Sequence, residues 1–164
     1  MAAWLRRSSR YGAMIREVLT RHEMPEDLRC VAMAESGFDP TVRSNRGAVG
    51  MWQFVRRTGE EYGLSGNRWI DTRMDPEAST DAAARYLGDL HQRFGSWELA
   101  LAAYNAGLGR VSRAIQRSGS RDFWALDLPR ETRNYVPLFM AVAIMSKAPT
   151  LFGFDELQLE PPLR

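Results

Sequence analysis

The chain has 164 residues, of which 45% are hydrophobic and 26% are charged. These values are typical of one globular domain with a sizeable core, and they exclude a disordered or a fibrous chain. The net charge is only +2, and nearly all of the positive residues are arginine, because Lys147 is the single lysine. No basic run is interleaved with aromatic residues, so nucleic acid is not an expected partner.

The single cysteine, Cys30, lies in the apolar run "LRCVAMA" and is expected to be buried without a disulfide partner. No histidine or second cysteine stands at ligand spacing, so we expect no metal and no other cofactor. The longest apolar run is far shorter than the ~18 residues of a membrane span. The first residues, "MAAWLRRSSR", lack the apolar core of a signal peptide. The protein is therefore expected to be either cytoplasmic or a trimmed piece of an exported precursor.

Helical periodicity dominates the first half of the chain. The stretch "YGAMIREVLTRHEM" places its apolar residues on one face, and Pro25 followed by two acids opens a second helix that ends near Gly37. A loop rich in Gly, Ser and Asn follows, with at most one short hairpin in residues 39–48. The next stretch, "GMWQFVRRTGEEYGL", is predicted to form a short helix that stops near Gly63.

The second half is also predicted to be helical. Pro76 begins a long helix that runs to "HQRF", and Ser96 is a candidate N-cap for a helix that ends before Gly107. The stretch "GRVSRAIQRS" follows directly, and a late apolar helix is expected to be kinked around Pro137. We expect one domain over residues 1–150, followed by an extended tail or linker over residues 151–164.

The stretch "VAMAESGFDP" ends its helix on a carboxylate, Glu35. The C-terminus of a helix is the negative end of its dipole, so an anion there is disfavoured by a few tenths to about 1 kcal/mol. Glu35 therefore either points into water or is held in place for its chemistry. In the loop that follows, Gly47 and Gly50 have no side chain and so allow close approach of the backbone. The side-chain amide of Gln53 then offers both a hydrogen-bond donor and an acceptor.

Two further segments carry polar residues at helix ends. "AAYNAGLGRV" places Tyr104 and Asn105 at the end of one helix, and "PRETRNYVP" places Glu131 and Tyr135 four residues apart, on one helical face. Taken alone, each segment also has an ordinary structural interpretation, as a helix exit or as a solvated face. The combination is more informative than any one segment.

Together, "AESGFDPTVRSNRGAVGMWQF", "ALAAYNAGLGRV" and "LPRETRNYVP" resemble the lytic transglycosylase domain of the soluble-transglycosylase type. The order and spacing of the segments are most similar to the membrane-bound lytic murein transglycosylase D branch, over residues 10–147. The resemblance implies an all-α, lysozyme-like fold of the goose-lysozyme kind. It also implies cleavage of the MurNAc–GlcNAc β-1,4 bond of peptidoglycan.

Carried over by position, the resemblance makes Glu35 the catalytic acid and base. The residues that it implies for substrate binding are Ser36, Ser44, Gln53, Tyr104, Asn105, Glu131 and Tyr135. Trp52 stands where many relatives have Met or another aliphatic residue, and it is as well suited to a sugar platform as to a core. The other tryptophans are expected in the core or between helices; they are Trp4, Trp69, Trp97 and Trp124.

The chemistry follows from a single carboxylate. Glu35 would protonate the leaving oxygen, which requires the raised pKa that apolar burial and a helix C-terminus favour. Hydrolysis normally needs a second carboxylate; Asp39 is expected to be a turn residue, and Glu131 is the only other serious candidate. A lytic transglycosylase avoids this need, because the C6 hydroxyl of the muramic acid attacks and leaves a 1,6-anhydro end.

Three alternatives stay open: a goose-type muramidase that hydrolyses, a catalytically silent glycan-binding module, and a cytoplasmic helical interaction protein. The resemblance implies a monomer that acts on glycan strands with peptide stems in the periplasm or cell envelope. It also leaves room for an outer-membrane anchor in the full-length protein.

Overall fold

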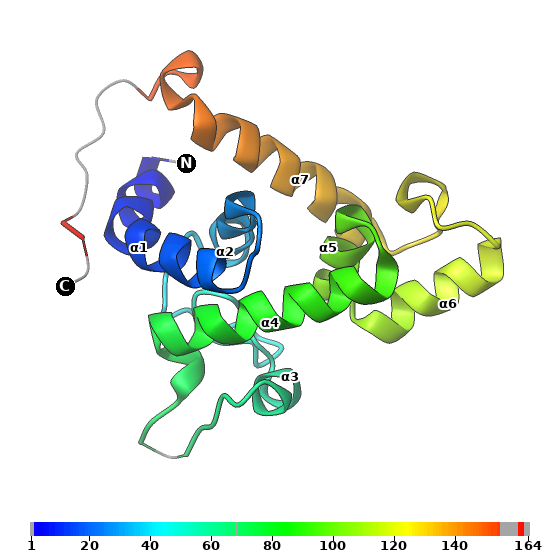
Figure 1. Ribbon diagram of the computed structural model, residues 1–164, viewed down its shortest axis with the longest axis horizontal. Helices are drawn as coiled ribbons and strands as arrows, with labels where there is room; N and C mark the ends of the chain where they lie inside the picture. Colours follow the sequence, from blue (N-terminus) through cyan, green and yellow to red (C-terminus); the bar gives the residue numbers. More distant parts are fainter. Residues whose placement is uncertain (1, 68, 155–160, 163–164) are drawn as a thin grey trace. The chain divides into compact units, whose positions relative to one another are not determined.

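The computed structural model describes residues 2–67, 69–154 and 161–162. Apart from isolated β-bridges, its regular structure is helical (Figure 1). The elements are α1 (Ala2–Arg21), η1 (Glu26–Leu28), α2 (Arg29–Ser36), α3 (Arg56–Glu61), η2 (Thr72–Met74), α4 (Pro76–Phe94), α5 (Trp97–Ala106), α6 (Leu108–Ser118), η3 (Phe123–Ala125), α7 (Arg130–Lys147) and η4 (Pro149–Phe152).

The chain forms two compact units. Unit 1 comprises Met1–Arg85 and Val142–Arg164, and unit 2 comprises Tyr86–Ala141. Helices α4 and α7 therefore each contribute residues to both units.

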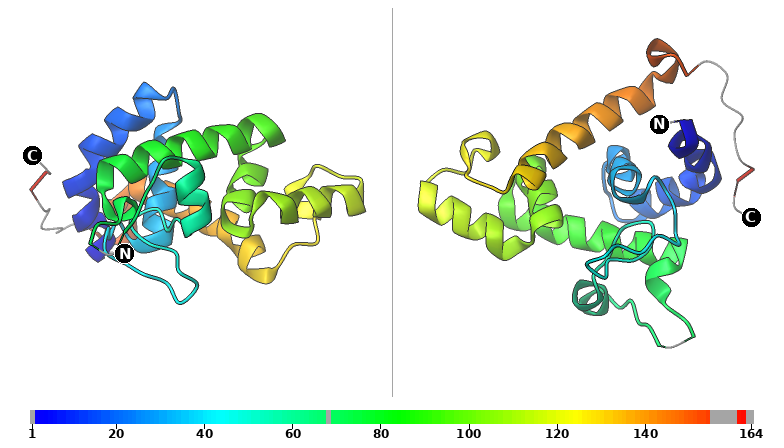
Figure 2. Two further views of the ribbon diagram at one scale, coloured as in Figure 1. Left: turned by 90° about the horizontal axis from the view of Figure 1, so that it is seen from below. Right: turned by 180° about the vertical axis from the view of Figure 1, so that it is seen from behind.

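Unit 1 is built around α1 and α2, which lie side by side in all three ribbon views (Figures 1 and 2). Its buried apolar residues include Ile15, Val31 and Trp52. The C-terminal end of α7 is tied to this group, because Lys147 Nζ lies 2.6 Å from the carboxylate of Asp27 at η1. Burial of these apolar side chains is the main source of stability for the unit.

Unit 2 is centred on α5, whose residues 99–103 are all buried. The predicted N-cap is confirmed, because the Ser96 hydroxyl accepts a hydrogen bond from the backbone amide of Leu99 at 3.4 Å. Gly107, with φ +87°, turns the chain directly from α5 into α6, and the two helices contact each other (Figure 2). The sequence expectation of a helix break at Gly107 is thus confirmed.

Several local predictions were wrong in detail. The second helix begins as the 3-10 turn η1, and α3 begins only at Arg56, because residues 50–53 form a turn in which both Gly50 and Gln53 have positive φ. The short hairpin is present as a bridge between Arg43 and Val49, and Val49 is bridged in turn to Phe54.

The predicted C-terminal tail lies mostly outside the described residues. Within it, Leu151 and Phe152 belong to the 3-10 helix η4, which Pro149 begins shortly after the end of α7. The extended tail beyond this point stays a prediction.

The tryptophans divide between the core and the surface. Trp52 is 0% exposed, and its Nε1 donates a hydrogen bond to the Thr80 hydroxyl at 2.9 Å, so it is a core residue and not a sugar platform. Trp69 and Trp124 are 85% and 61% exposed, so the expectation that they are buried was wrong. Cys30 is buried as expected, and this burial raises the pKa of its thiol.

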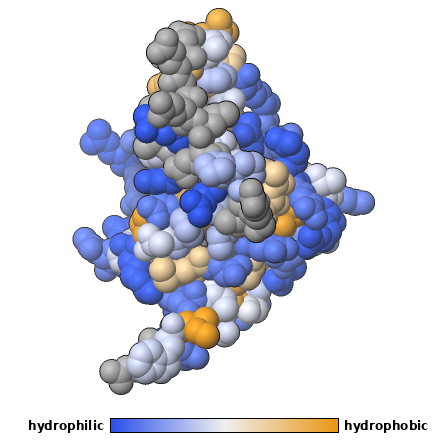
Figure 3. Space-filling view, turned by 90° about the vertical axis from the view of Figure 1, so that its left-hand side faces the viewer, coloured by the Kyte–Doolittle hydropathy of each residue, from blue (hydrophilic) through white to orange (hydrophobic). Residues whose placement is uncertain are grey.

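The face drawn in Figure 3 is largely hydrophilic, with apolar side chains in small, separate patches. Among the described residues, none of the helices combines the length and the apolar character that a membrane crossing requires.

Replacing Trp52 tests this account of the core. Trp52→Phe removes the hydrogen bond to Thr80 and leaves part of the indole volume empty, so the free energy of unfolding should fall by about 1.5–3 kcal/mol. Urea unfolding followed by circular dichroism measures the change. The matched control is Trp124→Phe at an exposed site, which should stay within about 0.5 kcal/mol of the parent protein. Equal effects of the two substitutions would contradict the assignment of Trp52 to the core.

Candidate functional site

Glu35 is the second-last residue of α2 and is partly buried. The helix stops after it because Gly37 and Phe38 both adopt left-handed backbone conformations, each with φ +62°. Their amides close the helix end: Gly37 N donates to Met33 O at 3.0 Å and Phe38 N donates to Ala32 O at 3.3 Å. The carboxylate is therefore fixed at the negative end of a short helix, one residue before a sharp change of chain direction.

Helix α1 supports this turn from the side. The Arg7 guanidinium donates to the Gly37 carbonyl at 3.1 Å and lies 3.7 Å from the Asp39 carboxylate. The Trp4 indole packs directly on Gly37, where a Cβ would overlap it. A glycine is thus required at position 37 for two reasons, the positive φ and the close approach of the indole.

Ser36 joins the end of α2 to the next loop. Its hydroxyl donates to the Met51 carbonyl at 2.8 Å and accepts from the Asp39 amide at 3.0 Å. Residue 36 thereby fixes the turn after Glu35 against the 50–53 turn. Binding of substrate by Ser36 stays a prediction, whereas its hydrogen bonds within unit 1 are structural.

Gln53 and Ser44 lie in the loop that follows. The Gln53 side-chain amide donates to Gly50 O at 2.8 Å and to Val42 O at 3.3 Å, which leaves Oε1 as the atom that can accept from a ligand. The Ser44 hydroxyl oxygen accepts from Ala48 N at 3.0 Å, so its own hydrogen can be donated outward. Both side chains are oriented by backbone contacts within unit 1.

An ion pair that the sequence analysis missed holds this loop in place. The side chains of Asp71 and Arg73 are each 13% exposed and their closest nitrogen and oxygen atoms are 2.7 Å apart. The same guanidinium donates through Nη1 to Gly47 O and to Phe54 O, both at 3.1 Å. At Gly50, a Cβ would overlap with the Arg73 carbonyl oxygen, so the backbones are in close contact here. No sequence pattern indicates these contacts, because Gly47 and Arg73 are 26 positions apart.

The carboxylate nearest to Glu35 along the chain, that of Asp39, serves a structural role. Asp39 accepts from the amide and the hydroxyl of Thr41 at 2.9 and 2.7 Å, as expected of a turn residue. Partial burial alone would raise the pKa of Asp39, but these hydrogen bonds and the charge of Arg7 hold it below its usual range. Asp39 thus stabilises the turn in its ionised form.

The other four predicted residues lie in unit 2. Tyr104 and Asn105 occupy the last turn of α5, and the Tyr104 ring lies 5.3 Å from the ring of Tyr86. Glu131 is exposed in the first turn of α7, where the positive end of the helix dipole favours a carboxylate, and Tyr135 is 7% exposed one turn later. Thus Glu35, Ser36, Ser44 and Gln53 belong to unit 1, and the remaining predicted residues belong to unit 2.

Comparison with known families gives this arrangement its context. Residues 13–126 match the family model of the transglycosylase SLT domain. The chain belongs to this family. Six of the eight predicted site residues fall within the matched stretch, whereas Glu131 and Tyr135 lie beyond it.

Individual SLT relatives agree with the family assignment. The membrane-bound lytic murein transglycosylase D of Escherichia coli K12 is 40% identical over 152 residues, which are 90% of this chain and 34% of the relative. The chain thus spans about a third of the length of this relative. The resemblance to this branch, which the sequence motifs indicated, is confirmed.

Solved SLT structures agree with the fold. The 70 kDa soluble lytic transglycosylase of Escherichia coli matches with a TM-score of 0.69 at 26% identity, over 87% of this chain and 24% of that protein. A complex of a 70 kDa soluble lytic transglycosylase with bulgecin A matches with a TM-score of 0.70 at 27% identity, over 92% of this chain and 25% of that one. The predicted all-α, lysozyme-like fold is confirmed.

The Asp71–Arg73 pair leads to a prediction about acid stability. Hydrogen bonds from Arg73 lower the pKa of Asp71, against a smaller raising effect of burial. A lowered pKa in the folded state stabilises the protein above the unfolded value of about 3.9, and this stabilisation is lost as the pH falls through the folded value. Asp71→Asn should therefore cost about 2–3 kcal/mol at pH 7, and the difference from the parent protein should shrink below about pH 4.

Urea unfolding at a series of pH values measures this difference. The control is Glu61→Gln, which removes an exposed pair with Arg57 and should change the free energy of unfolding by less than about 0.5 kcal/mol at any pH. A difference between parent and Asp71→Asn that stays constant from pH 7 to pH 3 would contradict the account.

Proposed function

We propose that this protein is a lytic transglycosylase that cleaves the MurNAc–GlcNAc β-1,4 bond of peptidoglycan without consuming water, with Glu35 as its only catalytic acid and base. The observation that carries the proposal is the setting of Glu35 within the SLT motif. Glu35 is the second-last residue of α2 and is followed by a turn that Ser36 and Arg7 fix from two sides. The next acid along the chain, Asp39, accepts hydrogen bonds within that turn.

In the first step, the carboxylic acid of Glu35 donates its proton to the glycosidic oxygen. The bond between this oxygen and the anomeric carbon of the muramic acid then breaks, and positive charge develops on that sugar. The leaving sugar departs with a new hydroxyl group, and Glu35 is left as a carboxylate. General acid catalysis of this kind contributes about 10²–10⁴-fold to the rate.

In the second step, the C6 hydroxyl of the same muramic acid attacks its anomeric carbon. Glu35 takes the hydroxyl proton, so the carboxylic acid is restored and the sugar closes into its 1,6-anhydro form. An attacking group already attached to the substrate can have an effective concentration of about 10⁵–10⁸ M, so it competes well with water. The catalytic cycle balances without a second acid or a water molecule.

All the remaining predicted residues except Ser36 are assigned to substrate binding. Gln53 can accept through Oε1 and Ser44 can donate through its hydroxyl, and both are oriented by the unit 1 loop. In unit 2, Tyr104, Asn105 and Tyr135 are proposed to contact the glycan. Ser36 is assigned to holding the turn and, through it, Glu35.

Hydrolysis is the main competing reaction, and it would require Glu131 to activate water. Glu131 lies in the first turn of α7, which is a favourable place for a carboxylate on structural grounds alone. We therefore assign Glu131 a supporting role in the binding of substrate.

The proposed place of action is the cell envelope. The Escherichia coli relative is named as membrane-bound and as acting on murein, and peptidoglycan lies outside the cytoplasmic membrane. Glycan strands of peptidoglycan are accordingly the proposed partner. The complex of a related enzyme with bulgecin A makes this compound a suitable competitor in binding assays.

Replacing Glu35 tests the catalytic assignment. Glu35→Gln keeps the shape of the side chain and removes the proton transfer, so release of soluble muropeptides from purified peptidoglycan should fall at least about 10²-fold. The free energy of unfolding should change little, because the side chain is at the edge of the core. The control is Glu77→Gln in the first turn of α4, which should keep parental turnover. Retention of a third or more of the parental rate by Glu35→Gln would contradict the assignment.

A further inference from the structure

Trp69 is exposed to solvent on the surface of unit 1. Its side chain is 85% exposed, and the neighbouring Ile70 is 64% exposed. The Asn67 side-chain oxygen accepts from the amides of both residues, at 2.7 and 2.9 Å, and the Asn67 amide donates to Ile70 O at 2.7 Å. These bonds hold the amides of Trp69 and Ile70 to Asn67 within one surface loop.

The base of the same loop is closed by further bonds. A β-bridge joins Gly66 to Asp71, and three hydrogen bonds join Thr72 to Ser65. The Thr72 amide donates to Ser65 O at 2.9 Å, and the Thr72 hydroxyl accepts from Ser65 N and donates to Ser65 O, both at 2.8 Å. Asp71 is in turn held by Arg73. The loop is therefore anchored to the pair that also fixes the Gly47–Phe54 segment.

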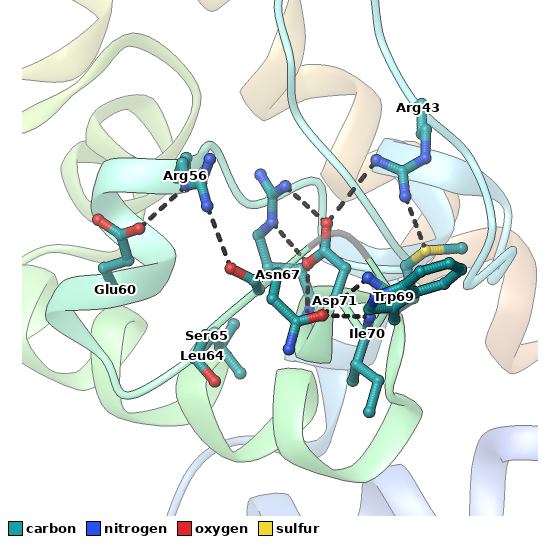
Figure 4. A pocket seen from close by; sticks show the side chains of 12 residues that line it. Arg43, Arg56, Glu60, Leu64, Ser65, Asn67, Trp69, Ile70 and Asp71 are labelled. Atoms are coloured by element: carbon teal, nitrogen blue, oxygen red, sulfur yellow. Dashed lines mark hydrogen bonds and ion pairs between the residues drawn. The ribbon is translucent and has the colours of Figure 1, made fainter.

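A pocket of about 340 Å³ opens beside Trp69 within unit 1 (Figure 4). The residues that line it are Arg43, Arg56, Glu60, Leu64, Ser65, Gly66, Asn67, Trp69, Ile70, Asp71, Arg73 and Met74. Its volume lies in the range of small-ligand sites. None of these lining residues is among the site residues expected from the sequence.

The pocket combines one large aromatic face with polar groups that still have hydrogen-bonding capacity. Arg56 uses Nε on Glu60 at 3.0 Å and Nη2 on Gly66 O at 3.1 Å, which leaves further donors of its five N–H groups. Arg43 is exposed; its Nη1 lies 3.7 Å from the Asp71 carboxylate and its Nη2 donates to Met74 Sδ at 3.2 Å, which leaves further N–H donors. In Figure 4, Arg43 and Arg56 stand on opposite sides of Asp71.

We infer that this pocket is a carbohydrate subsite that holds an N-acetylhexosamine ring of the glycan strand, with Trp69 beneath the ring and Arg43, Arg56 and Asn67 at its polar edge. A sugar ring has an apolar face of C–H groups and a rim of hydroxyl and acetamido groups, which matches one flat aromatic surface among polar donors. The identity of the glycan rests on the proposed function.

Charge argues against an anionic headgroup as the occupant. The three arginines of the lining are offset by Glu60 and Asp71, so the pocket carries little net charge. A phosphate or a lipid headgroup would favour unpaired cations, whereas a neutral sugar needs none. Because the lining contains no residue assigned to the reaction, the subsite strengthens the binding of the strand and leaves the bond-breaking steps unchanged.

Binding of a defined glycan tests the inference. In a Glu35→Gln background, which prevents cleavage, the affinity for a β-1,4-linked N-acetylglucosamine hexamer is measured by calorimetry, together with co-sedimentation with purified peptidoglycan. Trp69→Ala should raise the Kd about three- to tenfold. Trp69→Phe should recover part of the affinity, because it retains an aromatic face.

The matched control is Trp124→Ala, which removes another exposed tryptophan and should leave the Kd unchanged. Because Trp69 is almost fully exposed, Trp69→Ala should keep the parental circular dichroism spectrum and Tm. Equal Kd values for Trp69→Ala and the parent would overturn the subsite. If Trp69→Ala instead lost the parent's binding to phosphatidylglycerol vesicles but bound the hexamer as the parent does, the pocket would be a lipid site. A parent that binds neither the hexamer nor peptidoglycan would overturn the proposed function itself.

Discussion

The guanidinium of Arg73 connects three separate stretches of unit 1. It pairs with Asp71 in its own loop and donates to the carbonyls of Gly47 and Phe54, which flank the turn that carries Gln53. In the same turn, the Met51 carbonyl accepts a hydrogen bond from the hydroxyl of Ser36, and Ser36 ends the helix that carries Glu35. A largely buried, fully hydrogen-bonded charge pair is costly to break, so the pair fixes both loops at once. The candidate site in unit 1 and the Trp69 pocket therefore depend on the same contact.

Rigidity near Glu35 matters because the proposed chemistry uses one carboxylate twice. The same oxygen atoms must first release a proton to the leaving group and then accept one from the C6 hydroxyl, so a small displacement would misplace two steps. The left-handed residues Gly37 and Phe38 allow the helix to end directly after Ser36. The packing of Trp4 and the bond from Arg7 then hold this short turn from α1.

The helical content and most helix boundaries could be predicted from the sequence, because they depend on local signals. Ser96 as an N-cap and Gly107 as a helix exit are examples, since each acts within a few residues of its own position. The family motifs also indicated Glu35, since they combine several short matches at fixed spacing.

Features that depend on contacts between distant residues could not be predicted. The sequence does not distinguish Trp52, which is buried against Thr80, from Trp69, which is exposed on a loop, because the two differ in tertiary surroundings and not in residue type. The 50–53 turn was predicted as helix for a similar reason: the positive φ of Gln53 is imposed by bonds to Gly50 and Val42. Asp71 and Arg73 are only two positions apart, but the bonds from Arg73 to Gly47 and Phe54 span 26 and 19 positions, and no local pattern indicates them.

The central claim is that one carboxylate suffices because the substrate supplies its own nucleophile. Mass spectrometry of the muropeptides released from purified peptidoglycan tests this claim most directly. The account predicts that the products end mainly in 1,6-anhydro-muramic acid, and each should be lighter by one water than the corresponding reducing-end product. Products that end mainly in reducing muramic acid would contradict it, since water would then be the nucleophile and a second acid, with Glu131 the first to be tested, would be required.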